Sequence, residues 1–256
     1  MTPRLAPEFL TTPLAHRALH DVTDGRPENS RAAIIAAVSA GYGIEIDLQL
    51  SRDAQAMVFH DYGLDRLAKA KGAIRQKSSE ELASIGLIGG DEGVPTLPEV
   101  LDLVAGRVPL LIELKDQDGQ MGTNIGALEA ATAAALNAYA GPVAVMSFNP
   151  NSVAKLAELL PHIPRGITTS SYLHDNWPTL PATVCDHLKE IPDFDRVGAS
   201  FISHEVDDLT RPRVADLKSQ GAEILCWTVT SPQMEAEACK VAANITFEQY
   251  LAEFPA

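Results

Sequence analysis

The most constraining feature of this sequence is a regular alternation of short apolar runs with longer amphipathic stretches along most of its 256 residues. The runs resemble β-strands in length and composition, and most of the stretches between them have helical periodicity. Such alternation predicts a parallel sheet, either doubly wound or closed into a (β/α)8 barrel. The candidate strands are residues 13–17, 43–50, 56–61, 109–115, 143–148, 165–169, 199–206, 223–229 and 244–247, and the clearest helical stretches are residues 29–40, 125–140, 150–160, 212–220 and 232–242.

Nine strands are one more than a (β/α)8 barrel needs. The second and third runs are separated only by residues 51–55, which are too few for a crossover helix, so these runs are predicted to form an antiparallel hairpin. A hairpin folded about Asp53 and Ala54 would place Asp47 opposite His60. One antiparallel strand and eight others are therefore expected.

The glycine motifs of nucleotide-binding folds, Gly-x-Gly-x-x-Gly and the Walker loop, are absent from the sequence, which favours the closed barrel over the doubly wound sheet. We predict an α/β fold, a (β/α)8 TIM barrel, formed as a single domain by residues 1–256. Residues 62–95 and 172–198 fit no strand–helix repeat and are expected to form a small insertion or long loops at the C-terminal face, where function commonly lies.

The charge of the chain excludes some classes of partner. Thirty-four acidic residues against twenty basic ones give a formal charge of −14, so nucleic acid and anionic lipid would be repelled. No stretch approaches the ~20 apolar residues of a membrane span, and the first residues lack the apolar core of a signal peptide. The three cysteines match no metal spacing. We expect a cytoplasmic protein with a small-molecule substrate and no integral membrane segment.

Acidic side chains recur on one face of two predicted inner strands. Glu45 and Asp47 alternate with apolar residues, and Glu113 and Lys115 share a face of an otherwise apolar run. Taken alone, these patterns also fit a solvated sheet face and a private Glu–Lys pair. Inside a barrel, however, inward carboxylates need a cation or a hydrogen-bond network. Three carboxylates without thiolates indicate one hard divalent cation, Mg²⁺ or Ca²⁺, with Mn²⁺ also compatible.

Two histidines end strand candidates next to residues that suit phosphate chemistry. His16 precedes Arg17, and His60 precedes Asp61. A lone histidine at a strand end is commonly structural, but two of them near carboxylates can serve as general acid and general base. Arg17 offers a guanidinium fork for a phosphate oxygen. With a divalent cation and Lys115, this set suits phosphodiester cleavage.

The order of these motifs resembles that of the glycerophosphodiester phosphodiesterases, in particular the bacterial cytoplasmic enzymes. The resemblance runs from about residue 14 to the end of the chain, and the ordered set is far more specific than any single motif. The matching motifs are Ala15-His16-Arg17, Pro27-Glu28-Asn29-Ser30, Glu45-Ile46-Asp47, Phe59-His60-Asp61, Pro95-Thr96-Leu97-Pro98-Glu99-Val100-Leu101, Glu113-Leu114-Lys115 and Cys226-Trp227-Thr228-Val229.

This resemblance implies a (β/α)8 barrel and metal-dependent hydrolysis of glycerophosphodiesters to sn-glycerol 3-phosphate and an alcohol such as choline or ethanolamine. The glycerol 2-hydroxyl would attack first, giving a cyclic phosphate that water then opens. The implied roles are metal binding by Glu45, Asp47 and Glu113, acid/base catalysis by His16 and His60, and phosphate binding by Arg17 and Lys115.

The same resemblance implies roles in or around the site for three further residues, and two of these residues also have a purely structural alternative. Glu28 is an expected outer-shell partner at the mouth of the site. Asn29 is either a second such partner or only a helix cap, and Trp227 is either part of the glycerol-binding wall or a core aromatic. Which histidine is the base, and which alcohol leaves, stays open at this point.

The sequence departs from the family pattern at several positions. Ala18 stands where glycine usually follows the His-Arg pair, residues 66–68 are Arg-Leu-Ala in place of Arg-Thr-Thr, and residues 246–248 are Thr-Phe-Glu where a Thr-Asp pair is expected. His20 and Asp21 match no family position and are predicted to face solvent. These changes bear on substrate preference more than on the chemistry.

Other functions remain to be weighed against hydrolysis. The main alternative is a phospholipase D-like lyase acting on lysophospholipid headgroups, which would use the same residues, although such relatives are mostly secreted and disulfide-bonded. A glycosidase using Glu45 and Glu113 leaves both histidines unexplained. A non-catalytic barrel that binds a phosphorylated ligand would not need the metal and histidine set. The sequence is compatible with a homo-oligomer.

Overall fold

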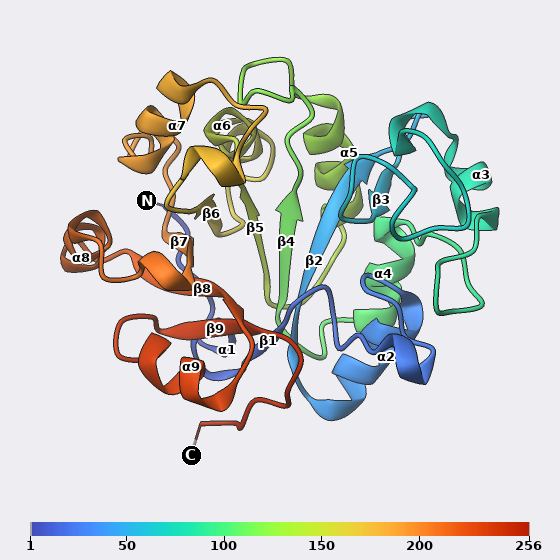
Figure 1. Ribbon diagram of the computed structural model, residues 1–256, viewed down its shortest axis with the longest axis horizontal. Helices are drawn as coiled ribbons and strands as arrows, with labels where there is room; N and C mark the ends of the chain where they lie inside the picture. Colours follow the sequence, from blue (N-terminus) through green and yellow to red (C-terminus); the bar gives the residue numbers. More distant parts are fainter. Residues whose placement is uncertain (1, 256) are drawn as a thin grey trace.

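The structure, a computed structural model, describes residues 2–255 and contains a closed barrel of eight parallel strands (Figure 1). Pairing of the first strand with both the second and the last closes the barrel, and the third strand lies antiparallel at the outer edge of the second. The predicted (β/α)8 barrel is thereby confirmed. The strands are β1 (Leu14–Ala15), β2 (Gly43–Leu50), β3 (Ala56–Val58), β4 (Leu110–Leu114), β5 (Val143–Ser147), β6 (Arg165–Thr169), β7 (Phe201–Glu205), β8 (Glu223–Val229) and β9 (Asn244–Phe247).

Helices surround the barrel (Figure 1), and several of them begin at a residue whose side chain caps the helix. Thr96 and Glu99 form a reciprocal capping box, and Asn149 and Ser231 each cap a helix that begins with proline. The α-helices are α1 (Glu8–Thr11), α2 (Arg31–Ala40), α3 (Ser79–Ser84), α4 (Leu97–Val104), α5 (Ala127–Leu136), α6 (Pro150–Leu159), α7 (Ala182–Lys189), α8 (Pro212–Ser219) and α9 (Pro232–Ala238), and the 3-10 helices are η1 (Val22–Asp24), η2 (Ile74–Gln76), η3 (His174–Asn176) and η4 (Val206–Asp208).

The barrel interior is filled below the site by its own small core. Apolar side chains of β1, β4, β5, β7 and β8 meet there with Leu5 and Phe9 of the N-terminal segment. Asn244 fixes this segment by donating hydrogen bonds to the carbonyls of Phe9 and Thr12, both at 2.7 Å. Gly166 is needed because a Cβ there would lie 2.3 Å from the ring of Phe201. The amino end of the barrel is therefore sealed, and the carboxyl end holds the cavity.

The β2–β3 hairpin is antiparallel as predicted, but its register is not the predicted one. Leu48 pairs with Val58, which places Asp47 opposite Phe59 rather than opposite His60. The difference arises because the turn contains three residues closed by the Ser51–Gln55 backbone hydrogen bond, with Ala54 left-handed at φ 60°. His60 therefore lies one residue beyond the predicted position.

Two segments outside the strand–helix repeat form covering structures near the carboxyl ends of the strands. Residues between β3 and α4 enclose a separate apolar cluster that includes Phe59, Leu64 and Leu82, and α3 lies on this segment (Figure 1). The segment between β6 and β7 carries α7 and packs Tyr172 against Cys185. Among the described residues, no helix is long and apolar enough to cross a membrane.

Candidate active site

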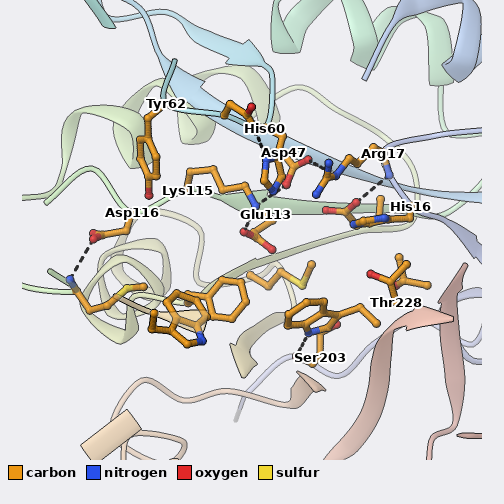
Figure 2. A pocket seen from close by; sticks show the side chains of 18 residues that line it. His16, Arg17, Asp47, His60, Tyr62, Glu113, Lys115, Asp116, Ser203 and Thr228 are labelled. Carbon is orange, nitrogen blue, oxygen red and sulfur yellow. Dashed lines mark hydrogen bonds and ion pairs between the residues drawn. The ribbon is translucent and has the colours of Figure 1, made fainter. Parts of the chain in front are cut away.

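A cavity of about 390 Å³ opens at the carboxyl ends of the barrel strands and brings ionic residues to face an aromatic wall (Figure 2). The ionic side comes from β2 and β4 and from the residues that follow β1, β3 and β4. The opposite side comes from β5, β7, β8 and the segment after β6. The lining residues are His16, Arg17, Glu45, Asp47, His60, Asp61, Tyr62, Glu113, Lys115, Asp116, Met121, Met146, Phe148, Trp177, Ser203, Trp227, Thr228 and Thr246.

Three buried carboxylates lie together on the ionic side. Glu45 and Asp47 share the inner face of β2, and Asp47 is the direct neighbour of Glu113 across the β2–β4 pair. One oxygen from each lies within 4.8 Å of the other two. Burial, followed by the charges of Asp47 and Glu113, raises the pKa of Glu45 well above its ordinary value. An all-carboxylate oxygen set with surplus negative charge fits a hard divalent cation.

Two basic side chains partly neutralise these carboxylates. The Lys115 ammonium lies 2.7 Å from Asp47 Oδ1 and also contacts Glu113 Oε1. The Arg17 guanidinium lies 3.6 Å from Asp47 Oδ2, and the Arg17 backbone N–H donates to Glu45 Oε2 at 3.0 Å. Burial favours the neutral Asp47 carboxyl, but Lys115, His60 and Arg17 outweigh it and hold its pKa well below the ordinary value. Arg17 and Lys115 thus face the cavity beside the carboxylates.

Glu28 and Asn29 support the ionic side from the loop before α2. Glu28 accepts hydrogen bonds from Arg17 at 2.8 Å and from Arg66 at 3.0 Å. Asn29 donates to Asp47 Oδ2 at 2.9 Å. The helix-cap alternative for Asn29 is wrong, because α2 begins at Arg31 and Ser30 caps it. Both residues therefore contact side chains of the predicted site.

His16 contacts the carboxylate of Glu248, a residue at which the sequence departs from the family pattern. The Glu248 Oε2 atom lies 2.7 Å from His16 Nδ1 and 3.4 Å from His20 Nε2. Burial lowers the pKa of His16, and the Glu248 hydrogen bond only partly compensates. The expectation that His20 faces solvent is wrong, because its Nε2 atom is buried and lies 3.4 Å from Glu248 Oε2, whereas the Asp21 side chain is 46% exposed.

His60, also on the ionic side of the cavity, has a similar carboxylate partner. Its Nδ1 atom lies 2.6 Å from Asp61 Oδ1. Asp61 also accepts two hydrogen bonds from Arg66, each at 2.7 Å. Burial would raise the pKa of Asp61, but the hydrogen bonds from His60 and Arg66 hold it well below its ordinary value. Arg66, which matches the arginine of the family's Arg-Thr-Thr, thus joins Asp61 to Glu28.

The backbone at the ionic side is left-handed at three non-glycine residues. Arg17, Ala18 and Asn29 have φ values of 52°, 65° and 59°. This conformation costs an L-residue about 1–2 kcal/mol and is ordinary for glycine, which explains why a glycine after the His-Arg pair would suit the turn. Ala18 adopts it and keeps its N–H bonded to the Glu45 carbonyl at 3.0 Å. The backbone conformation expected of glycine is thus present with alanine.

The opposite wall is aromatic and was only partly predicted. Trp227 lines the cavity and donates from Nε1 to the Ser203 carbonyl at 3.0 Å. Phe148 contacts Trp227 edge-on with ring centroids 5.6 Å apart, and Trp177 contacts Phe148 at 5.0 Å. Trp177 was not predicted as a site residue because it lies in the irregular segment 172–198, where no periodicity indicates which way a side chain points. The presence of a tryptophan in a segment expected near the site was the one available signal.

The sequence that forms this fold and cavity matches the model of a known protein family. Residues 16–247 match the model of the Glycerophosphoryl diester phosphodiesterase family. The chain belongs to this family. Membership makes it an enzyme, a phosphoric diester hydrolase, as the resemblance of its motifs implied.

Individual relatives agree over most of the chain. The YhdW protein of Bacillus subtilis strain 168 is 29% identical over 233 residues, covering 88% of each protein. A glycerophosphodiester phosphodiesterase of Bacillus altitudinis is 29% identical over 174 residues, covering 64% of this chain and 69% of that enzyme. An Oleispira antarctica phosphodiesterase, solved with the product sn-glycerol 3-phosphate, shares the fold with a TM-score of 0.74 at 22% identity, covering 96% of this chain and 92% of that one.

Proposed function

We propose that this family member hydrolyses glycerophosphodiesters to sn-glycerol 3-phosphate and an alcohol, with one divalent cation and two catalytic histidines. The observation that carries the proposal is one cavity in which three carboxylates within 4.8 Å of one another lie beside Arg17 and Lys115. His16 and His60 line the same cavity. The product in the Oleispira antarctica complex, sn-glycerol 3-phosphate, supports the substrate class.

The carboxylate cluster is the proposed metal site. Glu45, Asp47 and Glu113 would hold Mg²⁺ or Ca²⁺, with Mn²⁺ also suited to these oxygen ligands. When held there, a divalent cation would supply Lewis-acid polarisation of the phosphoryl oxygen and of a substrate hydroxyl. Arg17 and Lys115 are proposed to bind the remaining phosphate oxygens, since both cationic groups face the cavity beside the carboxylates.

His16 and His60 are the proposed acid/base pair. One imidazole takes the proton of the attacking glycerol 2-hydroxyl while its oxygen bonds to phosphorus, and the other protonates the departing alcohol as the old P–O bond breaks. Water then opens the cyclic phosphate with the two roles reversed. Each ring is held at Nδ1 by a carboxylate, Glu248 or Asp61, which supports Nε2 as the reacting atom.

We further propose that residues 1–256, of which 1 and 256 lie outside the described part, act as one domain on a small-molecule substrate in the cytoplasm. The formal charge of −14 argues against nucleic acid as a partner. Cys185, Cys226 and Cys239 are free thiols, which suits a reducing compartment. A homo-oligomer remains a prediction that light scattering of the purified protein would test.

The test is release of sn-glycerol 3-phosphate from glycerophosphocholine and glycerophosphoethanolamine after EDTA treatment and addition of Mg²⁺, Ca²⁺ or Mn²⁺. Release restored by one or more ions is the expected result. A folded protein that releases nothing from either substrate with any ion would contradict the proposal. Lysophosphatidylcholine is included as a third substrate, and headgroup release from it alone would favour the lyase.

A further inference from the structure

Glu248 places one carboxylate oxygen between two imidazole rings. The residue directly follows β9, and its backbone N–H is held by the Val229 carbonyl at 3.0 Å. Its Oε2 atom lies 2.7 Å from His16 Nδ1 and 3.4 Å from His20 Nε2. The proposed acid/base roles do not by themselves require this carboxylate, and His20 lies outside the cavity lining.

The two histidine–carboxylate pairs of the site differ in what else contacts the carboxylate. Asp61, the partner of His60, also forms an ion pair with Arg66 at 2.7 Å. Within residues 2–255, Glu248 contacts the imidazoles of His16 and His20 and forms no ion pair with a lysine or arginine. The Glu248 carboxylate is therefore contacted by two imidazoles and by the neutral Gln249 amide, whereas the charge of Asp61 is largely balanced by a permanent cation.

The protonation of Glu248 decides which nitrogen of His16 carries hydrogen. The hydrogen bond with His16 and the nearby His20 imidazole hold the pKa of Glu248 well below its ordinary value, so the group is a carboxylate and only accepts. His16 Nδ1 must then be the donor. Nε2 makes no hydrogen bond with the described residues and belongs to a side chain that lines the cavity.

The charge state of His16 follows from its surroundings. Burial is the largest effect and lowers its pKa, Arg17 acts in the same direction, and Glu248 and Asp47 oppose them. A neutral ring protonated at Nδ1 has its lone pair at Nε2. This is the form that can accept a proton in the cavity.

We propose that Glu248 is the positioning residue for His16, fixing the Nδ1–H tautomer so that Nε2 acts as the general base, with His20 beside the same carboxylate oxygen. The proposal rests on the proposed function. As the substrate hydroxyl oxygen bonds to phosphorus, its proton moves to His16 Nε2, and Glu248 stabilises the imidazolium. The proton later returns when His16 acts as the acid for the opening of the cyclic phosphate.

Glu248→Gln tests the role of the carboxylate charge, because glutamine keeps the side-chain length of glutamate without its charge. The glutamine amide can also donate to His16 Nδ1, which favours the Nε2–H tautomer. We expect kcat for glycerophosphocholine to fall roughly 10²-fold or more with KM changed less than about threefold. Glu248→Asp should recover part of this loss, since it restores the charge. His20→Asn should lower kcat by less than Glu248→Gln, and the exposed control Glu253→Gln should have no effect.

The tautomer of His16 can be measured by NMR without substrate, and this measurement distinguishes a positioning role of Glu248 from a general loss of activity. The ¹⁵N shifts of His16, assigned through His16→Asn, report which ring nitrogen carries the proton. We expect an Nδ1–H ring in the wild-type protein and in Glu248→Asp, and a mixed or Nε2–H ring in Glu248→Gln. The same tautomer population in all three, or an unchanged kcat in a folded Glu248→Gln protein, would overturn the proposal.

The two proposals fail separately in this design. A wild-type protein that releases no sn-glycerol 3-phosphate would contradict the proposed function. The tautomer of His16 would still show whether Glu248 orients the ring, because it is measured in the absence of substrate. An Nδ1–H preference that disappears in Glu248→Gln supports the positioning role in either case.

Discussion

The Asn29 side chain bonds to Asp47 twice: its amide donates to Asp47 Oδ2 at 2.9 Å, and its carbonyl oxygen accepts from the Asp47 backbone N–H at 3.3 Å. Both residues are buried, so neither bond is readily replaced by water. The pair connects the loop before α2 to the inner face of β2. It fixes one carboxylate of the proposed metal site in orientation, as partners of metal ligands commonly do.

Asn29→Gly should therefore weaken binding of the divalent cation without removing one of its proposed ligands. Glycine is chosen because Asn29 has φ 59°, a conformation that glycine adopts without strain. Loss of a hydrogen-bonding partner of a metal ligand typically lowers metal affinity about 10–100-fold. Isothermal titration of the EDTA-treated protein with Mg²⁺, Ca²⁺ and Mn²⁺ measures this change. Affinities equal to those of the wild-type protein would show that Asn29 does not orient a metal ligand.

Glu45→Gln should stabilise the metal-free protein at neutral pH while weakening cation binding. Burial, with Asp47 and Glu113 nearby, raises the pKa of Glu45 in the folded state. Its contribution to folding is thus present at low pH and is lost as the pH rises through the folded-state pKa. Glutamine removes the buried charge, and each kcal/mol gained raises Tm by about 2–4 °C in a chain of this size.

Thermal denaturation in EDTA between pH 4 and pH 8 is the appropriate measurement for this variant. The difference in Tm between Glu45→Gln and the wild-type protein should grow toward pH 8 and shrink toward pH 4. Added Mg²⁺ or Ca²⁺ should stabilise the wild-type protein more than the variant. A wild-type protein that is more stable than the variant at pH 8 in EDTA would contradict this account.

The barrel and the ionic side of its cavity could be predicted because both depend on short-range patterns. Alternation along residues 43–50 places Glu45 and Asp47 on one face, and a parallel neighbour then places Glu113 beside Asp47. Strand ends give the positions of His16 and His60 in the same way. Alternation within a strand and the pairing of neighbouring parallel strands are thus sufficient to gather the carboxylates, whereas the exact position of His60 also depends on the hairpin turn.

The remaining parts depend on geometry that no local pattern carries. Ala54 adopts a left-handed conformation that glycine or asparagine more commonly adopts, so the sequence gives no signal for this turn. The predicted hairpin register is therefore wrong by one residue. Glu248 reaches His16 across 232 positions of sequence, and only closure of the barrel between β1 and β9 brings them together. Trp177 is placed by packing of an irregular segment against Phe148.

His16→Asn and His60→Asn should each reduce turnover by roughly 10²–10⁴-fold if both imidazoles transfer protons. Neither histidine belongs to the carboxylate cluster, so cation affinity should change by less than about threefold. Product release and isothermal titration on the same preparations measure the two effects. An active His16→Asn protein would remove His16 from the acid/base pair and, with it, the proposed role of Glu248.

Lys115→Met should destabilise the metal-free protein and raise the KM for substrate. The ammonium group lies 2.7 Å from Asp47 and contacts Glu113, and all three groups are largely buried. Removing one partner of a buried charged cluster leaves uncompensated carboxylates and costs about 3–5 kcal/mol. The phosphate would also lose one of its two proposed cationic partners.

The control for this variant is Lys155→Met, which removes a more exposed lysine paired with Glu158 and should cost less than about 1 kcal/mol. Urea denaturation in EDTA compares the two variants with the wild-type protein. Saturating Mg²⁺ or Ca²⁺ should return much of the stability of Lys115→Met, because the cation would replace the missing positive charge beside Asp47. Equal losses in the two variants, or no recovery on adding either ion, would mean that Lys115 does not balance the charge of the metal site.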